Sequence, residues 1–148
     1  MLDAIARSLS YWEWLGQLLA RTSVGLSFFL SGRGKLFVAA RRDQMLETIR
    51  QAGLPRPELS APAISSIEFT FGAMLCLGLL TPLSCVMLTG VMIGALATTQ
   101  LPGVRAPSGV DWLGEVLYLP EVLYVVILVW LLFAGPGWLS VDRLLLSP

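Results

Sequence analysis

The chain has 148 residues, of which 55% are hydrophobic and only 14% are charged, and its formal net charge is zero. Soluble domains average about 45–50% apolar and about 25% charged residues, and a domain of this size cannot bury such an apolar excess. The composition therefore excludes an ordinary soluble domain and a nucleic-acid-binding protein, and it indicates an integral membrane protein.

Histidine is absent, and there are two cysteines. The absence of histidine excludes His-ligated haem, most iron and copper sites and the usual general base. Two cysteines are too few for a disulfide framework or a thiolate zinc site. We therefore expect neither haem nor a metal, and the sequence shows no catalytic residue of its own.

Four segments are apolar and long enough to cross a membrane, which takes about 20 residues. They are residues 15–36, 63–80, 83–100 and 117–134. The first differs from a cleaved signal peptide, because it lacks a basic start and a small-residue cleavage site. Aromatic residues near the span ends are typical of a membrane interface; they are Trp12, Trp14, Trp112, Tyr118 and Trp138. The sequence predicts an all-α membrane four-helix bundle, as a single domain over 1–148.

The first span carries charges inside its apolar segment. Positions that advance by four and three residues share one helix face. Here they are Arg21, Gly25, Phe28, Gly32 and Lys35. Glycine in a membrane helix marks the close approach of a neighbouring helix. The charges on this stripe are therefore predicted to face the bundle and not the lipid.

Residues 38–61 form a longer, charged connection after the first span. Apolar residues recur there at helical spacing from Met45 to Ala52, and Gly53 followed by Pro55 is a helix stop signal. The pattern predicts a short amphipathic helix that lies on the membrane surface between the first two spans.

The second and third spans are predicted to form an antiparallel hairpin, with a tight turn at TPLS, residues 81–84. Glu68 and Gly72 lie four residues apart on one face of the second span. Cys76 and Cys85 flank the turn at heights that are awkward for a disulfide. We expect them to be small buried hydrophobes, with a redox pair as the weaker alternative.

The fourth span follows QLPGVRAPSGVDW, residues 100–112, which predicts an irregular loop. Glu115, Tyr118 and Glu121 fall on one helical stripe at the start of this span, although Pro120 interrupts it.

The C-terminal segment begins with AGPG at 134–137, which ends the fourth span. Ser140 is predicted to cap a brief terminal helix. Arg21 lies toward this end of the bundle, where the available acids are Asp142 and Glu13. We predict a structural ion pair between Arg21 and Asp142.

A second cluster is predicted around Glu68, about 9 Å into the second span at about 1.5 Å per residue. Cations of the first span and acids of the fourth approach the same depth. The candidate ligand-binding residues are Arg33, Lys35, Glu68, Glu115, Tyr118 and Glu121. An ionisable group in a membrane helix costs about 2.5–3.5 kcal/mol, so it suggests function. The alternative is that paired charges only fix the register of the helices.

Lys and Arg are unevenly distributed between the two ends of the predicted bundle. The long-loop side holds seven of them, and the opposite side holds Arg7, Arg143 and, depending on its depth, Arg21. The positive-inside rule then predicts that the long loops are cytoplasmic and that both termini lie outside.

Four ordered fragments resemble the DoxX family of small bacterial four-helix membrane proteins. They are RTSVGLSFFLSGRGKLF, EFTFGAMLCLGLLTPLS, LYLPEVLYVVILVWLLF and GPGWLSVD, and with their spacing they cover residues 17–145. The polar positions matched by this resemblance are Arg21, Gly32, Lys35, Glu68, Gly72 and Asp142. The resemblance implies a bacterial inner-membrane protein. It also implies a role like that of relatives named as subunits of thiosulfate–quinone oxidoreductases or as membrane partners of soluble redox enzymes.

Three functional hypotheses follow. The first is a membrane subunit or anchor of an oxidoreductase system that binds quinone or another small amphiphile near Glu68, with a soluble redox partner that brings the redox centre. The second is a non-enzymatic structural or scaffold protein. The third is a small transporter, for which four helices form only a thin pore unless the chain is a homo-oligomer.

Overall fold

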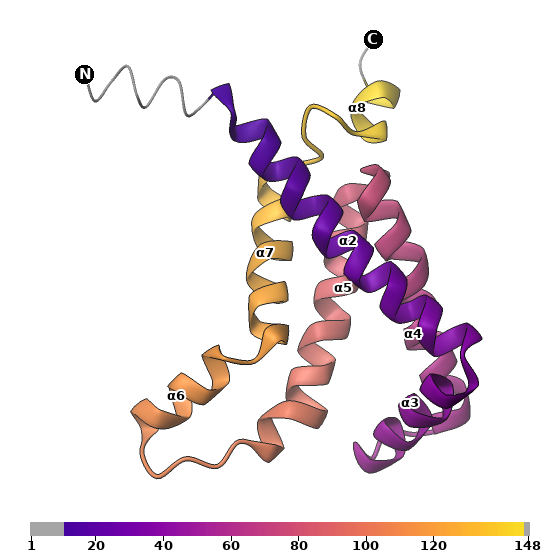
Figure 1. Ribbon diagram of the computed structural model, residues 1–148, viewed down its shortest axis with the longest axis vertical. Coiled ribbons are helices and arrows are strands. Elements are labelled where there is room, and N and C mark those ends of the chain that lie inside the picture. Colours follow the sequence, from indigo (N-terminus) through magenta and orange to yellow (C-terminus); the bar gives the residue numbers. More distant parts are fainter. Residues whose placement is uncertain (1–10, 147–148) are drawn as a thin grey trace.

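The computed structural model describes residues 11–146, and every regular element in that range is a helix (Figure 1). The four long helices are α2 (Glu13–Phe37), α4 (Pro57–Leu77), α5 (Thr81–Ala95) and α7 (Pro120–Ala134). The shorter ones are α3 (Ala39–Gln51), α6 (Gly109–Leu117) and α8 (Val141–Leu146). Helix α5 continues through a π-helical turn, η1 (Leu96–Gln100), and a 3-10 turn, η2 (Leu101–Gly103). Arg7, which entered the charge count above, lies outside the described residues.

Among the described helices, α4 and the continuous segment Thr81–Gly103 are long and apolar enough to cross a membrane. They overlap the predicted second and third spans. A third span results if α6 and α7 count as one span broken by a bend of 67°. Helix α2 contains the predicted first span, but it is not among the helices that are long and apolar enough to cross a membrane. The all-helical, membrane-type fold is thus confirmed, while four complete spans stay a prediction.

Helices α2 and α4 form the most extensive helix–helix contact, and glycine brings their backbones together. A Cβ atom at Gly72 would lie 2.5 Å from the backbone nitrogen of Phe29, and one at Gly32 would lie 2.7 Å from the carbonyl oxygen of Ser65. The rings of Phe29 and Phe69 stack beside this contact, with centroids 4.9 Å apart. The glycine stripe of α2 therefore faces its neighbour, as its spacing predicts.

The apolar core lies where α2, α4, α5 and α7 meet. Its buried members are Val24, Phe28, Leu75, Cys85, Leu88, Met92, Leu128 and Leu131. Helix α5 lies between α4 and α7 and packs against both of them. Many other large apolar side chains are exposed, which suits helices that are surrounded by lipid instead of water.

The turn between α4 and α5 lies at residues 78–80, and the predicted position at TPLS is wrong. Gly78 (φ 66°) and Leu80 (φ 47°) both adopt left-handed backbone conformations there. TPLS is instead the first turn of α5, because Pro82 has no N–H and the first turn of a helix needs none. The antiparallel hairpin of α4 and α5 is as predicted (Figure 1).

The fourth apolar segment, predicted as a span over 117–134, bends sharply at Leu119. Leu119 is extended (φ −69°, ψ 126°), as expected for a residue before proline, and α7 begins at Pro120. The predicted loop 100–112 is also partly helical, since η2 and the start of α6 lie within it. Ser108 caps α6, because its hydroxyl oxygen accepts the N–H of Asp111 at 3.2 Å.

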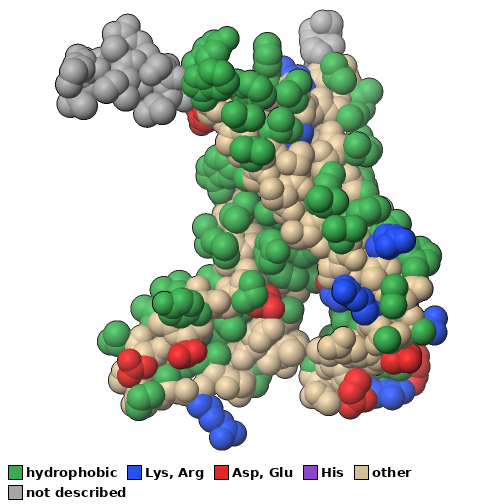
Figure 2. All heavy atoms as spheres, in the orientation of Figure 1, with side chains coloured by type: hydrophobic (Ala, Val, Ile, Leu, Met, Phe, Trp, Pro, Cys, Tyr) green, Lys and Arg blue, Asp and Glu red, His purple; other side chains and the backbone are tan. Residues whose placement is uncertain are grey.

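The predicted helix between the first two spans is α3, and the chain leaves it at Gly53 (φ 70°). Its one buried residue, Ile49, faces the body of the molecule, and its arginines are exposed. Figure 2 shows Lys and Arg side chains gathered near α3 and a hollow between the α3 end and the α6 end of the same face. That hollow is where the candidate site lies.

Candidate functional site

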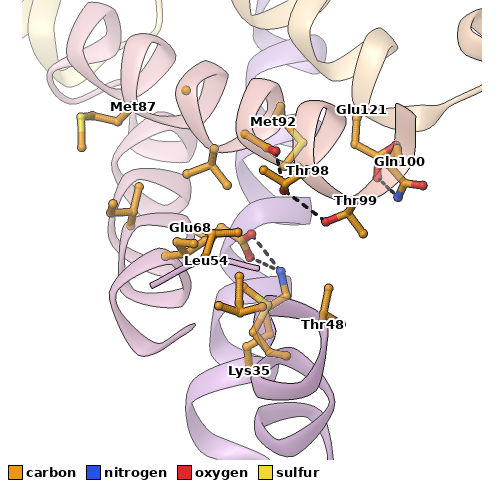
Figure 3. A pocket seen from close by; sticks show the side chains of 18 of the residues that line it. Lys35, Thr48, Leu54, Glu68, Met87, Met92, Thr98, Thr99, Gln100 and Glu121 are labelled. Atoms are coloured by element: carbon orange, nitrogen blue, oxygen red, sulfur yellow. Dashed lines mark hydrogen bonds and ion pairs between the residues drawn. The ribbon is translucent and has the colours of Figure 1, made fainter. Parts of the chain in front are cut away.

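Lys35 of α2 and Glu68 of α4 form an ion pair whose carboxylate is buried and whose lysine is partly exposed (Figure 3). The Lys35 Nζ lies 2.7 Å from Oε2 and 2.8 Å from Oε1 of Glu68, and the Ser31 hydroxyl donates to Oε2 at 3.0 Å. The side chain of Glu68 is 3% exposed and that of Lys35 is 26% exposed. Three hydrogen bonds therefore satisfy a carboxylate that solvent hardly reaches.

The local fold explains why these side chains meet. Ser31 and Lys35 lie four residues apart on one face of α2, and Gly32 on that face lets α4 approach. Gly32 packs against Ser65, which lies about one helical turn before Glu68. The sequence left the cation partner of Glu68 open between Arg33 and Lys35, and in the structure the partner is Lys35.

Two hollows meet at this ion pair. The larger, of about 500 Å³, lies between α3, α4 and α5 and has mainly apolar walls. The smaller, of about 210 Å³, lies between α2, α5 and α7. Lys35, Glu68, Met92 and Glu121 line both of them.

Glu121 lies in the first turn of α7, on the other side of the larger hollow from Lys35 (Figure 3). Its Oε1 accepts a hydrogen bond of 2.8 Å from the side-chain amide of Gln100, at the end of the π-helical turn. Its Oε2 is buried and has no hydrogen-bond partner within residues 11–146. Glu121 thus has one oxygen that is hydrogen-bonded and one that is not.

Three predicted site residues do not line these hollows. Arg33 is exposed, since it lies about 200° around the helix from Lys35. Glu115 is exposed on α6, and Tyr118 is 90% exposed at the end of that helix. The bend before α7 separates both from Glu121, so the predicted stripe does not exist.

Arg21 is 2% exposed and lies near the other end of α2. Its two terminal nitrogens donate hydrogen bonds to the carbonyl oxygens of Pro136 and Leu139. The direct ion pair predicted with Asp142 is not among those found in the described residues. The guanidinium instead binds the backbone that leads into α8, so the two residues interact only at longer range.

Asp142, at the start of α8, accepts hydrogen bonds from the backbone N–H groups of Leu80 at 2.6 Å and Thr81 at 2.7 Å. Burial opposes ionisation of this carboxyl. The hydrogen bonds from Thr81 and Leu80, together with the charge of Arg21, outweigh that effect and hold the pKa of Asp142 below its ordinary value. Ser140 caps α8 as predicted, since its hydroxyl oxygen accepts the N–H of Arg143 at 3.2 Å.

The site residues that the sequence prediction missed include Phe28, Ser31, Gln100 and Tyr124. Two had a usable signal: Ser31 precedes Lys35 by one helical turn, and Tyr124 follows Glu121 by three residues. The rings of Phe28 and Tyr124 pack at 5.2 Å in the smaller hollow. Gln100 had no signal, because the π-helical turn that positions it cannot be read from periodicity.

No group of three or more His, Cys, Asp or Glu residues within residues 11–146 is arranged to hold a metal ion. Cys76 and Cys85 are both free thiols, and Cys85 is fully buried. What the site offers is a cation, two carboxylates and an amide beside apolar space. Such an arrangement can bind the polar head of an amphiphile and enclose its tail.

A family model described as DoxX matches residues 16–101, which is more than half of the chain. The matched segment contains Lys35, Glu68 and Gln100, whereas Glu121 and Asp142 lie beyond it. No curated protein and no solved structure matches the chain significantly.

Proposed function

The chain belongs to the DoxX family of membrane proteins, and we propose that it is a membrane subunit or anchor of an oxidoreductase system. In this proposal it binds quinone or another small amphiphile between its helices. The observation that carries the proposal is the Lys35–Glu68 pair at the junction of two hollows.

The larger hollow suits the tail of such a ligand. Its volume of about 500 Å³ lies in the range of small-molecule sites, about 300–1,000 Å³. Apolar side chains of three helices line most of it, among them Ile49, Ile64 and Val91. The charged groups of its lining are Lys35 and Glu68 on one side and Glu121 on the other, and Thr98 and Thr99 lie between them (Figure 3).

The proposal includes a partner for electron transfer. The chain has no histidine and its two thiols are free, so a soluble redox protein would bring the electron carrier. We further propose a bacterial inner-membrane location with the α3 and α6 end facing the cytoplasm, because Lys and Arg are more numerous there. Reaction of single engineered cysteines in α3 and α8 with a membrane-impermeant thiol reagent tests that orientation.

Ligand titration tests the proposed site. Quinones with short tails are titrated into the detergent-purified protein, and into its Lys35→Met and Glu68→Gln variants, with calorimetric detection. We expect measurable binding to the wild-type protein and at least tenfold weaker binding to either variant, since each loses a charged hydrogen-bonding group worth about 1.5–3 kcal/mol. Glu115→Gln on exposed α6 is the matched control. Unchanged affinity in both site variants would remove the site.

A structural role for the charges is the second candidate, favoured by one observation. Lys35 and Ser31 together already satisfy both oxygens of Glu68. If the pair only fixes the register of α2 against α4, the same variants lower thermal stability in detergent and no amphiphile raises it. Ligand-dependent stabilisation of the wild-type protein separates the two candidates.

A further inference from the structure

Glu121 presents an unsatisfied acceptor beside both hollows. Gln100 occupies its Oε1, whereas its Oε2 is buried without a hydrogen-bond partner in the described part of the chain. Buried polar oxygens are nearly always hydrogen-bonded. The terminal torsion of a glutamate side chain is broad, so the carboxylate can turn toward a donor in either hollow at little cost.

Lys35 presents a donor to the same space. An ammonium group has three N–H donors, and the two hydrogen bonds of Lys35 within the described residues both go to Glu68. The third N–H is left for a ligand atom. The junction of the hollows therefore offers one acceptor, on Glu121, and one donor, on Lys35.

The smaller hollow suits a planar ring. Phe28, Pro120 and Tyr124 line it, together with the charged residues that it shares with the larger hollow. Aromatic rings pack favourably against one another, and Phe28 and Tyr124 already pack here with their ring planes tilted by 56°. A ring that carries oxygen substituents can thus lie here while its tail extends into the larger hollow.

We infer that this site binds a hydroquinone in preference to the corresponding quinone. The inference rests on the proposed function, because it specifies which redox form of the ligand the site prefers. A hydroquinone O–H donates to Oε2 of Glu121, and an oxygen of the same ring accepts from Lys35. The oxygens of a quinone only accept hydrogen bonds, so they leave Glu121 without a partner.

The Glu121→Gln variant gives a sharp test, because it exchanges an acceptor for a donor. Its amide oxygen can still accept the hydrogen bond from Gln100, and its NH₂ group then lies where Oε2 is now. Loss of a hydrogen bond to a charged group changes affinity by about tenfold or more. The preference for the hydroquinone is therefore expected to disappear in this variant, because the oxygens of both redox forms can accept a hydrogen bond from its NH₂ group.

The experiment measures the affinity of a decyl-substituted benzoquinone and of its hydroquinone for the detergent-purified protein without oxygen, by calorimetry. We expect the hydroquinone to bind the wild-type protein at least about tenfold more tightly. Glu121→Gln is expected to bind the two forms with similar affinity, whereas the control Glu115→Gln, on exposed α6, should behave as wild type. Both variants are first checked for slow labelling of the buried Cys85 thiol, which shows that they are folded.

The outcomes separate this inference from the proposed function. Equal affinities in the wild-type protein, or tighter binding of the quinone, overturn the preference but leave the amphiphile site standing. No binding of either form to the folded wild-type protein overturns both. A hydroquinone preference that persists unchanged in Glu121→Gln also overturns the inference, because the donor would then not meet Glu121. The wild-type comparison decides the question even if the variant fails to fold.

Discussion

The carboxylate of Asp142 accepts the backbone N–H of Thr81 at 2.7 Å, so α8 caps the first turn of α5 from a distant part of the sequence. Helix N-termini leave N–H groups without helical partners, and a carboxylate supplies both an acceptor and a favourable charge. No residue near α5 in the sequence provides this cap through its side chain. The contact therefore ties the C-terminal segment to the α4–α5 hairpin.

This cap predicts a loss of stability in acid. Because the pKa of Asp142 is lowered in the folded protein, the unfolded protein binds the proton more readily. The stabilisation is then fully present above the ordinary carboxyl pKa of about 3.9 and is lost as the pH falls through the lower, folded value. Unfolding in detergent is followed by tryptophan fluorescence between pH 3 and pH 6, values chosen to bracket about 3.9.

The Asp142→Asn variant is expected to lack most of this acid dependence. Its free energy of unfolding at neutral pH should also be lower by about 1–3 kcal/mol, since one of the two backbone N–H groups loses a charged acceptor. The control is Asp43→Asn on exposed α3, which should keep the wild-type profile. If Asp142→Asn and wild type lose stability in parallel as the pH falls, another group is responsible.

Lys35 and Glu68 are expected to respond unequally to substitution. Lys35→Met leaves a carboxylate that is only 3% exposed without its cation, which costs about 3–5 kcal/mol for a buried pair. Glu68→Gln leaves a lysine that is already partly exposed and can extend toward water. We expect that variant to lose only about 1 kcal/mol.

Denaturant unfolding of the two variants in one detergent measures this difference. The double variant Lys35→Met, Glu68→Leu should be more stable than Lys35→Met alone, because apolar pairs often replace buried ion pairs at no net cost. An equal loss of stability in Lys35→Met and Glu68→Gln would mean that Glu68 is more hydrated than its burial indicates.

Arg21 should not tolerate lysine. Its guanidinium donates to two carbonyl groups, of Pro136 and Leu139, from a rigid planar fork. A lysine keeps the charge but cannot reproduce that geometry. We expect Arg21→Lys to lose about 1–3 kcal/mol in detergent unfolding, whereas Arg42→Lys on the exposed face of α3 should be neutral. A neutral Arg21→Lys would show that charge alone matters at this site.

The sequence predicted what depends on local spacing and composition. The helical spacing of residues 21–35 placed Lys35 on the stripe that faces the bundle, and the glycines on that stripe predicted the close approach of a neighbouring helix, which is α4. The break before Pro120 was visible, but its angle was not, because a bend of 67° depends on how α6 and α7 pack and not on the proline alone. Glu115 and Tyr118 were misplaced for this reason.

The contacts of Asp142 and Glu121 could not be predicted from the sequence, for a different reason. Asp142 was assigned to Arg21, because opposite charges at similar depth are the natural pair. The two backbone N–H groups at the start of α5 compete for the same carboxylate, and they are closer. The bond between Glu121 and Gln100 depends on a π-helical turn, which shifts the register of the preceding helix and leaves no mark in its periodicity.

The last prediction compares Gly72 and Gly90, because the space around these two glycines differs. A Cβ atom at Gly72 would lie 2.5 Å from the backbone of α2, whereas one at Gly90 meets nothing within 4 Å. Gly72→Ala must therefore push α2 and α4 apart. We expect its free energy of unfolding to be lower by about 1–3 kcal/mol, which is typical of overpacking. Gly90→Ala should instead gain up to about 1 kcal/mol from helix propensity. Thermal unfolding of both in detergent measures the contrast, and a Gly72→Ala protein as stable as wild type would mean that α2 and α4 are not in backbone contact.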